Sequence, residues 1–216
     1  MVQSAARSRG RPPAAERAPE RSRAELTQAA AELVAEQGFE AASVQQICAR
    51  AGLSKGTFYW NFDSKGELFL ALVEERVERP IREAIALLGS ATAGQDMAQE
   101  SNRALLDALR RDRNAVLLDD EYWLRAVRDP VIRRRYARRQ RDLRAALADA
   151  LESRRRQLGA PPFRIAPEHL AIGYLSLVSG IARSRLVDPD GIPDELFAEF
   201  LGITFAGLVA TAEAGN

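Results

Sequence analysis

The chain has 216 residues, of which 46% are hydrophobic and 28% charged, and its formal net charge is +1; this is an ordinary globular composition, long enough to bury a real core. A single cysteine, Cys48, and a single histidine, His169, exclude an internal disulfide and most metal sites and histidine-based triads. The longest near-apolar run, Leu170 to Ala182, is shorter than the roughly 20 residues that cross a bilayer, so we expect a soluble cytoplasmic protein without a membrane partner.

Residues 1–20 are rich in Arg and Pro and show no apolar period, so we expect a disordered tail. Within it, Arg9-Gly10-Arg11-Pro12 resembles the core of an AT-hook, whose arginines enter a narrow A·T minor groove. The alternative is a tail that only keeps the protein soluble.

Capping signals divide residues 21–80 into short helices, and we expect this segment to form one domain. Helices are predicted to open at capping serines and to end or break at glycine or proline, with the starts at Ser22, Ser43, Ser54 and Ser64 and the breaks at Gly38, Gly52 and Pro80. The second and third of these helices, with Gly52 between them, predict a helix-turn-helix at about residues 43–62.

In a helix-turn-helix the last helix enters the major groove of DNA. Apolar side chains at helical spacing predict the core of this unit, namely Val44, Ile47, Leu53, Phe58 and Phe62. The side chains left to face outward, Lys55, Thr57, Tyr59 and Asn61, suit phosphates, base edges and thymine methyls.

The run from Ala42 to Leu68, with Ala51-Gly52-Leu53-Ser54-Lys55-Gly56-Thr57-Phe58-Tyr59 at its centre, resembles the signature of the TetR family of DNA-binding regulators. The resemblance implies DNA contacts from nine residues: Ser43, Gln45, Ser54, Lys55, Thr57, Tyr59, Trp60, Asn61 and Lys65. Among these, Ser43 and Lys65 would hold phosphates, Lys65 together with a helix dipole. Ordinary packing is the alternative for Tyr59 and Trp60. Cys48 stands where alanine is usual and is interpreted as a small core residue rather than a redox sensor.

Residues 81–216 read as helix throughout and predict an effector-binding and dimerisation domain, in an all-α chain of about nine helices. Aromatic and apolar side chains could line a ligand pocket, although each could equally be ordinary core: Met97, Tyr122, Trp123, Tyr136, Phe163 and Tyr174. The arginine clusters at 133–144 and 154–156 are interpreted as solvated helix faces, with a second nucleic-acid surface as the alternative.

The last two predicted helices, which begin at Pro167 and Pro193, are apolar on nearly every side and therefore need cover on every side. A two-fold dimer that forms a four-helix bundle would provide that cover. The interface would include Ile181, Phe197, Leu201, Phe205 and Leu208. The alternative is a monomer with these helices in its core.

These features predict a homodimeric DNA-binding transcription regulator without a cofactor. The family resemblance implies a repressor that a small-molecule effector releases from a palindromic operator. One alternative is an enzyme on a helical bundle, for which Asp119-Asp120-Glu121 could supply acids, but phosphate-loop, nucleophile-elbow and zinc motifs are missing from the sequence. A constitutive DNA-architectural protein is the other, although such a protein needs no large C-terminal domain.

Overall fold

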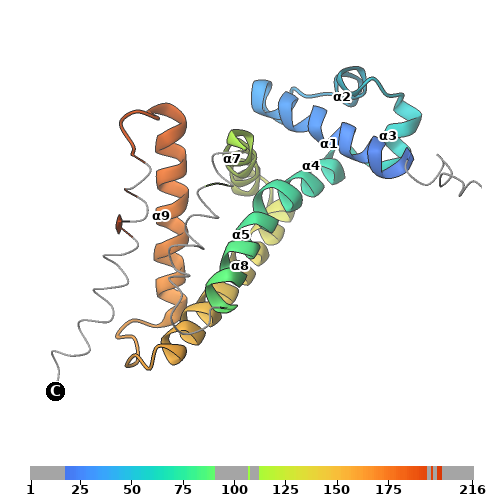
Figure 1. The fold of residues 1–216 in the computed structure, drawn as a ribbon. Coiled ribbons are helices and arrows are strands. Elements are labelled where there is room, and N and C mark those ends of the chain that lie inside the picture. The colour runs from blue at the N-terminus through green and yellow to red at the C-terminus, as the bar shows by residue number, and fades with distance from the viewer. Residues whose placement is uncertain (1–17, 91–106, 108–111, 194–195, 197–198, 201–216) are drawn as a thin grey trace, which may run out of the picture. The chain divides into compact units, whose positions relative to one another are not determined.

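The computed structural model describes residues 18–90, 107, 112–193, 196 and 199–200. These residues form helices and no strand, which confirms the all-α class (Figure 1). The chain divides into two compact units between Phe69 and Leu70. Met97, Phe197, Leu201, Phe205 and Leu208 all lie outside the described residues, as do the AT-hook-like tail and most of the last expected helix.

The N-terminal unit contains α1 (Ala18–Gln37), α2 (Val44–Ala51), α3 (Lys55–Asn61) and the start of α4 (Lys65–Val73). Its core is apolar and aromatic, with Leu26, Ile47, Phe58, Phe62 and Phe69 all buried. The aromatic rings meet edge to face or tilted, the geometry that aromatic pairs prefer. This small core fixes the mutual positions of α1, α2 and α3.

The helix limits of this unit follow its capping residues, with one exception. Gly38 and Gly52 have positive φ angles of 82° and 68°, so both glycines end helices as expected. The expected start of the first helix at Ser22 is wrong, because α1 already begins at Ala18. Glu25 bonds Arg21 one turn earlier, at 2.8 Å, instead of closing a capping box.

Pro80 leaves the chain of helices unbroken; the sequence suggested that it interrupts or restarts the helical pattern, and a helix begins beside it at Arg79. Proline has no amide hydrogen, so the carbonyl of Arg76, four residues earlier, loses its helical partner. The helix widens instead into the π-helical turn η1 (Glu74–Glu78), where the Arg79 amide donates to the Glu74 carbonyl, before α5 (Arg79–Ser90). Because α4, η1 and α5 run on without a gap, the expected count of about nine helices is slightly off.

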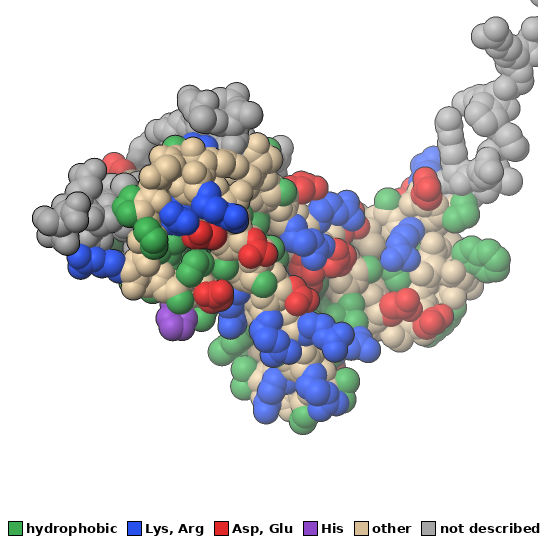
Figure 2. Space-filling model, turned by 90° about the horizontal axis from the view of Figure 1, so that it is seen from below, with side chains coloured by type: hydrophobic (Ala, Val, Ile, Leu, Met, Phe, Trp, Pro, Cys, Tyr) green, Lys and Arg blue, Asp and Glu red, His purple; other side chains and the backbone are tan. Residues whose placement is uncertain are grey.

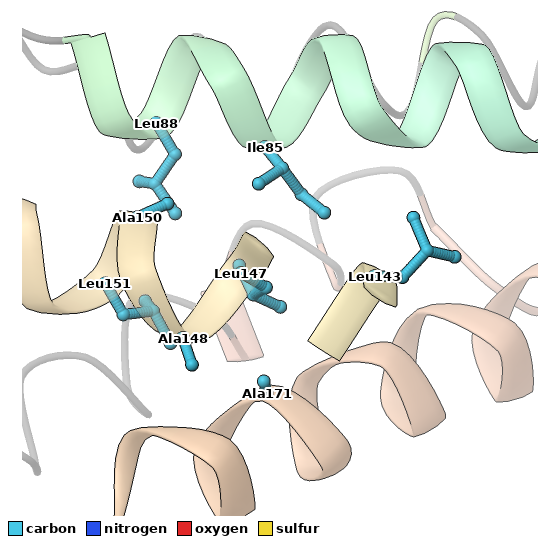
Figure 3. Close-up of a cluster of buried hydrophobic side chains, with 8 residues drawn as sticks. All are labelled: Ile85, Leu88, Leu143, Leu147, Ala148, Ala150, Leu151 and Ala171. Atoms are coloured by element: carbon cyan, nitrogen blue, oxygen red, sulfur yellow. The ribbon is translucent and has the colours of Figure 1, made fainter. Parts of the chain in front are cut away.

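The C-terminal unit contains α5, α7 (Arg113–Arg128), α8 (Pro130–Gln157) and α9 (Pro167–Val187). The long α8 packs against all three others. Figure 3 shows its main apolar cluster, in which Ile85 and Leu88 of α5 face Leu147 of α8, with Ala171 of α9 on the other side. The expected helix start at Pro167 is confirmed, since this proline stands in the first turn of α9, and Pro130 opens α8 in the same way.

The helix α9 is long and apolar for a chain of this composition. It has 21 residues, and its most apolar 18-residue stretch has a mean hydropathy of 1.3 and is only 17% buried. By length and composition it is the one helix among the described residues that could cross a membrane, a test that core helices of soluble proteins also pass. The apolar run judged too short from the sequence therefore belongs to a longer helix.

Candidate functional site

The turn between α2 and α3 fixes the direction of α3. Ser43 closes a capping box with Gln46 at the start of α2, and Gly52 ends that helix in the left-handed conformation. Ser54 then caps α3 by accepting a hydrogen bond from the Thr57 amide, at 3.0 Å. These caps satisfy backbone groups that a short helix would otherwise leave unpaired. The seven residues of α3 are thus held firmly enough to present side chains to a partner.

Four of the predicted DNA-contacting side chains are exposed and available. Tyr59 is 58% exposed and Trp60 is 81% exposed, so Trp60 is not a packing residue. Gln45 and Lys55 are exposed as well. Within the part of the chain that the structure describes, these four side chains make no hydrogen bond or ion pair. They form a surface of an ammonium, an amide, a phenol and an indole that is free to meet DNA.

Four others already have hydrogen-bond partners within the chain. The hydroxyl of Ser43 lies 2.8 Å from Gln46 Oε1, and the hydroxyls of Ser54 and Thr57 lie 2.9 Å apart. The Asn61 amide donates to the Thr57 carbonyl at 2.8 Å. These residues shape the helix-turn-helix, and a DNA contact from any of them would use its remaining lone pairs or replace one of these bonds.

Lys65 is held by the chain itself. Its ammonium donates to the carbonyls of Phe39, at 2.9 Å, and Glu40, at 3.3 Å, and lies 4.2 Å from the centre of the Phe39 ring. Three protons on one ammonium allow two carbonyl bonds and a further contact. The side chain therefore ties the loop after α1 to the start of α4, a role that sequence spacing did not reveal.

Cys48 behaves as the small core residue that the sequence suggested. Its side chain is buried, and its thiol lies 3.7 Å from the carbonyl of Ser54. Burial raises the pKa of the Cys48 thiol, which keeps it protonated and unreactive at neutral pH.

The C-terminal unit contains a cavity of about 60 Å³ where α5, α7 and α9 meet. Its wall is mostly apolar, with Ile81, Val116 and Val178 among the lining residues. Charged lining residues are neutralised by pairs: Arg183 bonds Asp120 at 2.5 Å, and Asp119 bonds the buried Arg139 at 2.6 Å. A small apolar hollow with paired charges suits a ligand that is mainly apolar.

The predicted pocket residues do not line this cavity. Tyr122 and Tyr136 pack edge to face, with ring centres 5.1 Å apart, and Trp123 is 45% exposed. Phe163 packs against the apolar cluster of Figure 3. Tyr174 lines a separate hollow of about 30 Å³, and its burial raises the pKa of its phenol. The cavity beside Pro80 is lined instead by aliphatic and charged residues of η1, α5, α7 and α9.

Comparison with known proteins identifies the chain. A model described as bacterial regulatory proteins, tetR family, matches residues 26–72, and one described as BetI-type transcriptional repressor, C-terminal, matches residues 94–209. The chain belongs to the TetR family. It is a DNA-binding transcriptional regulator, as the members of the TetR family are.

Individual relatives within the TetR family share the sequence only moderately. The transcriptional regulator TtgR of Pseudomonas putida is 27% identical over 188 residues, covering 79% of this chain and 83% of TtgR. The transcriptional activator FasR of Mycolicibacterium smegmatis is 31% identical over 90 residues, which are 42% of this chain and 41% of FasR.

A solved structure gives the same fold. SmeT, the repressor of a multidrug efflux pump of Stenotrophomonas maltophilia, superposes with a TM-score of 0.63 at 21% identity, covering 86% of this chain and 88% of SmeT. A complex of SmeT with triclosan gives a TM-score of 0.67 at 23% identity, covering 87% and 91%. At these identities the likeness concerns the fold.

Proposed function

We propose that this protein is a homodimeric repressor that reads a palindromic operator with α3 and leaves it when a small apolar molecule binds the C-terminal unit. The observation that carries the DNA-reading part is the exposed surface of Gln45, Lys55, Tyr59 and Trp60 beside a rigidly capped turn. A regulator of this kind needs no catalytic group and acts in the cytoplasm, where its operator lies. The activator FasR shows why the direction of regulation has to be measured.

The DNA-reading role is tested by truncating the exposed side chains. Operator fragments are first selected from genomic DNA with the wild-type protein, and affinity is then compared for Lys55→Ala and Tyr59→Ala. We expect each to weaken operator binding by roughly 1–3 kcal/mol, the range for a good base contact. Gln28→Ala, an exposed change on α1, is the control. Wild-type affinity in both Lys55→Ala and Tyr59→Ala would show that α3 does not read DNA.

Dimerisation follows from the exposed side of α9. Ile172 is 42% exposed, and Gly173, Ser176 and Gly180 lie on the same exposed stripe. A Cβ atom added at Gly173 or Gly180 would meet nothing within 4 Å inside the chain, so a second helix can approach closely there. A partner copy would cover this apolar face and would place two reading helices about 34–36 Å apart, or a multiple of that, to match successive major grooves.

The effector site is the cavity at α5, α7 and α9. At about 60 Å³ it is far smaller than the roughly 300–1,000 Å³ of ordinary ligand sites. A ligand of usual size therefore has to part the helices that line it, which include η1 and the start of α5. In the chain η1 directly follows α4. We therefore expect the ligand to bind the conformation with parted helices more tightly than the conformation that binds DNA, and a switch requires this difference in affinity.

The switch is tested by reciprocal titration. Candidate apolar compounds are titrated into the free protein and into the protein–operator complex. Linkage requires that the compound weakens operator binding and that the operator weakens binding of the compound by the same factor, about 5–150-fold. Ala182→Leu, which fills the cavity wall, should abolish the response while DNA binding persists, and Ala145→Leu on the exposed face of α8 should change neither. A compound that binds the free protein and the complex equally tightly is not the effector.

A further inference from the structure

The positive charge of the chain is concentrated away from the helix-turn-helix. Residues 1–69 contain nine basic residues and eight acidic ones, so the N-terminal unit carries almost no net charge. Residues 124–144 contain nine arginines and only two acidic residues, Asp129 and Asp142. Since DNA affinity depends on neutralising phosphates, the strongest candidate for an anion-binding surface lies in the C-terminal unit.

Four of these nine arginines lie along the exposed side of α8. Arg134 and Arg135 each lie three or four residues before Arg138, and Arg141 lies three residues after it, which places the four side chains on one helix surface, here called the arginine face. Within the described residues none of the four has a hydrogen bond or ion pair.

Two other arginines, the partly exposed Arg50 and the largely buried Arg155, do have acidic partners. Arg50 bonds Glu36 at 2.7 Å, and Arg155 bonds Glu152 at 2.6 Å. The acidic residues next to the arginine face do not play this role: the Asp129 carboxylate accepts the Val131 and Ile132 amides as the cap of α8.

Asp142 lies one turn beyond Arg138, but no ion pair joins the two side chains. The four arginines consequently repel each other at helical spacing, which disfavours the helix slightly. Figure 2 shows the same imbalance at the surface, where Lys and Arg side chains gather with hydrophobic ones and few acidic ones on the lobe at the bottom of the view.

We propose that the arginine face of α8 binds the phosphate backbone of nucleic acid as a contact separate from the helix-turn-helix. From Arg134 to Arg141 the helix rises about 10 Å, a length over which duplex DNA carries about six phosphate charges. Guanidinium groups bind phosphate oxygens through paired hydrogen bonds. The inference goes beyond the proposed function, in which only the helix-turn-helix meets DNA.

The arginine face does not suit a dimer interface. Two copies related by a two-fold axis would bring eight like charges together without acidic partners, and like charges across an interface oppose binding. The surface therefore stays free in the dimer proposed through α9.

The experiment uses the full chain and a random-sequence DNA duplex, with affinity measured by fluorescence anisotropy over a series of salt concentrations. The test variant R134Q/R138Q/R141Q removes three charges from the arginine face. The control variant R113Q/R156Q/R164Q removes three charges from exposed positions elsewhere in the same unit. Circular dichroism checks that both remain folded, and vesicles of phosphatidylserine and phosphatidylcholine serve as a second anionic probe.

We expect the test variant to bind the duplex more weakly and to lower the slope of log affinity against log salt by about 2.7 for each subunit that contacts the duplex, from three contacts at about 0.9 each, while the control changes the slope by less than one. Equal effects of the two variants, or no effect of either, would overturn the proposal, as would a loss of vesicle binding without a loss of DNA binding. The ratio of affinity for operator DNA to affinity for random-sequence DNA separates this result from the reading role of α3. Tyr59→Ala should lower this ratio, and the arginine variant should leave it unchanged.

Discussion

Gly52 and Gly56 lie on either side of the turn before α3, but only Gly52 has a left-handed backbone, with a φ angle of 68°. A Cβ at Gly52 would meet nothing within 4 Å, so Gly52→Ala adds only backbone strain, about 1–2 kcal/mol. A Cβ at Gly56 would make an ordinary contact with the Ser54 hydroxyl at 3.5 Å inside a helix, where alanine is favoured by roughly 0.5–1 kcal/mol. Urea unfolding should therefore show Gly52→Ala destabilised and Gly56→Ala stabilised; shifts of the same sign would contradict the assigned turn.

Lys65 has two candidate roles that one substitution separates. Its bonds to the Phe39 and Glu40 carbonyls predict that Lys65→Ala lowers the free energy of unfolding by about 1.5–3 kcal/mol, the range for hydrogen bonds to charged groups. The phosphate role predicts a salt slope of operator binding smaller by about 0.9 for each subunit. Urea unfolding and DNA titration on the same variant measure both. Unchanged stability would show that the carbonyl contacts contribute little in solution.

Among the helices, Arg139 joins three elements of the C-terminal unit. Its side chain is 6% exposed and lies 3.2 Å from Glu78 of η1 and 2.6 Å from Asp119 of α7, with the rings of Tyr122 and Tyr136 nearby. Arg139→Ala would leave the largely buried Asp119 carboxylate without this cation, and Glu78 with only the more exposed Arg82, at a cost of about 3–5 kcal/mol. Its exposed neighbour Arg138 supplies the control, since Arg138→Ala should change stability by less than about 0.5 kcal/mol. Thermal unfolding distinguishes them, and equal melting temperatures would refute the linking role of Arg139.

For the whole molecule, the exposed stripe of α9 predicts the oligomeric state. The wild-type protein should sediment as a dimer at micromolar concentration. Ser176→Arg would place a charge in the middle of the apolar contact and should yield monomers or, where the monomer is unstable, unfolded chain. Leu87→Arg, on the exposed side of α5, is the control and should remain dimeric. A wild-type monomer, or a stable dimer of Ser176→Arg, would place the interface elsewhere.

The all-helical class, the turn at Gly52 and the helix-turn-helix could be predicted from the amino-acid sequence alone. These features depend on local chemistry, because a capping serine, a left-handed glycine and the helical spacing of Ile47 and Phe58 act within a few residues. The family signature lies in the same short segment. Local rules failed at the start of α1, where an upstream run of residues able to form a helix extended it past Ser22.

The tertiary structure decided which of the candidate side chains are available. From the sequence, Lys65 and Asn61 were expected to be free donors. In the structure Lys65 donates to the carbonyl of Phe39, which is distant in sequence, and Asn61 donates to a backbone carbonyl one helical turn earlier. Tyr122 and Tyr136, both candidates for the ligand pocket, pack against each other, and neither lines the cavity beside Pro80. Spacing along one helix specifies which residues share a face. Whether those residues are buried or paired depends on which side chains of the other helices contact that face, and these contacts form only when the chain folds.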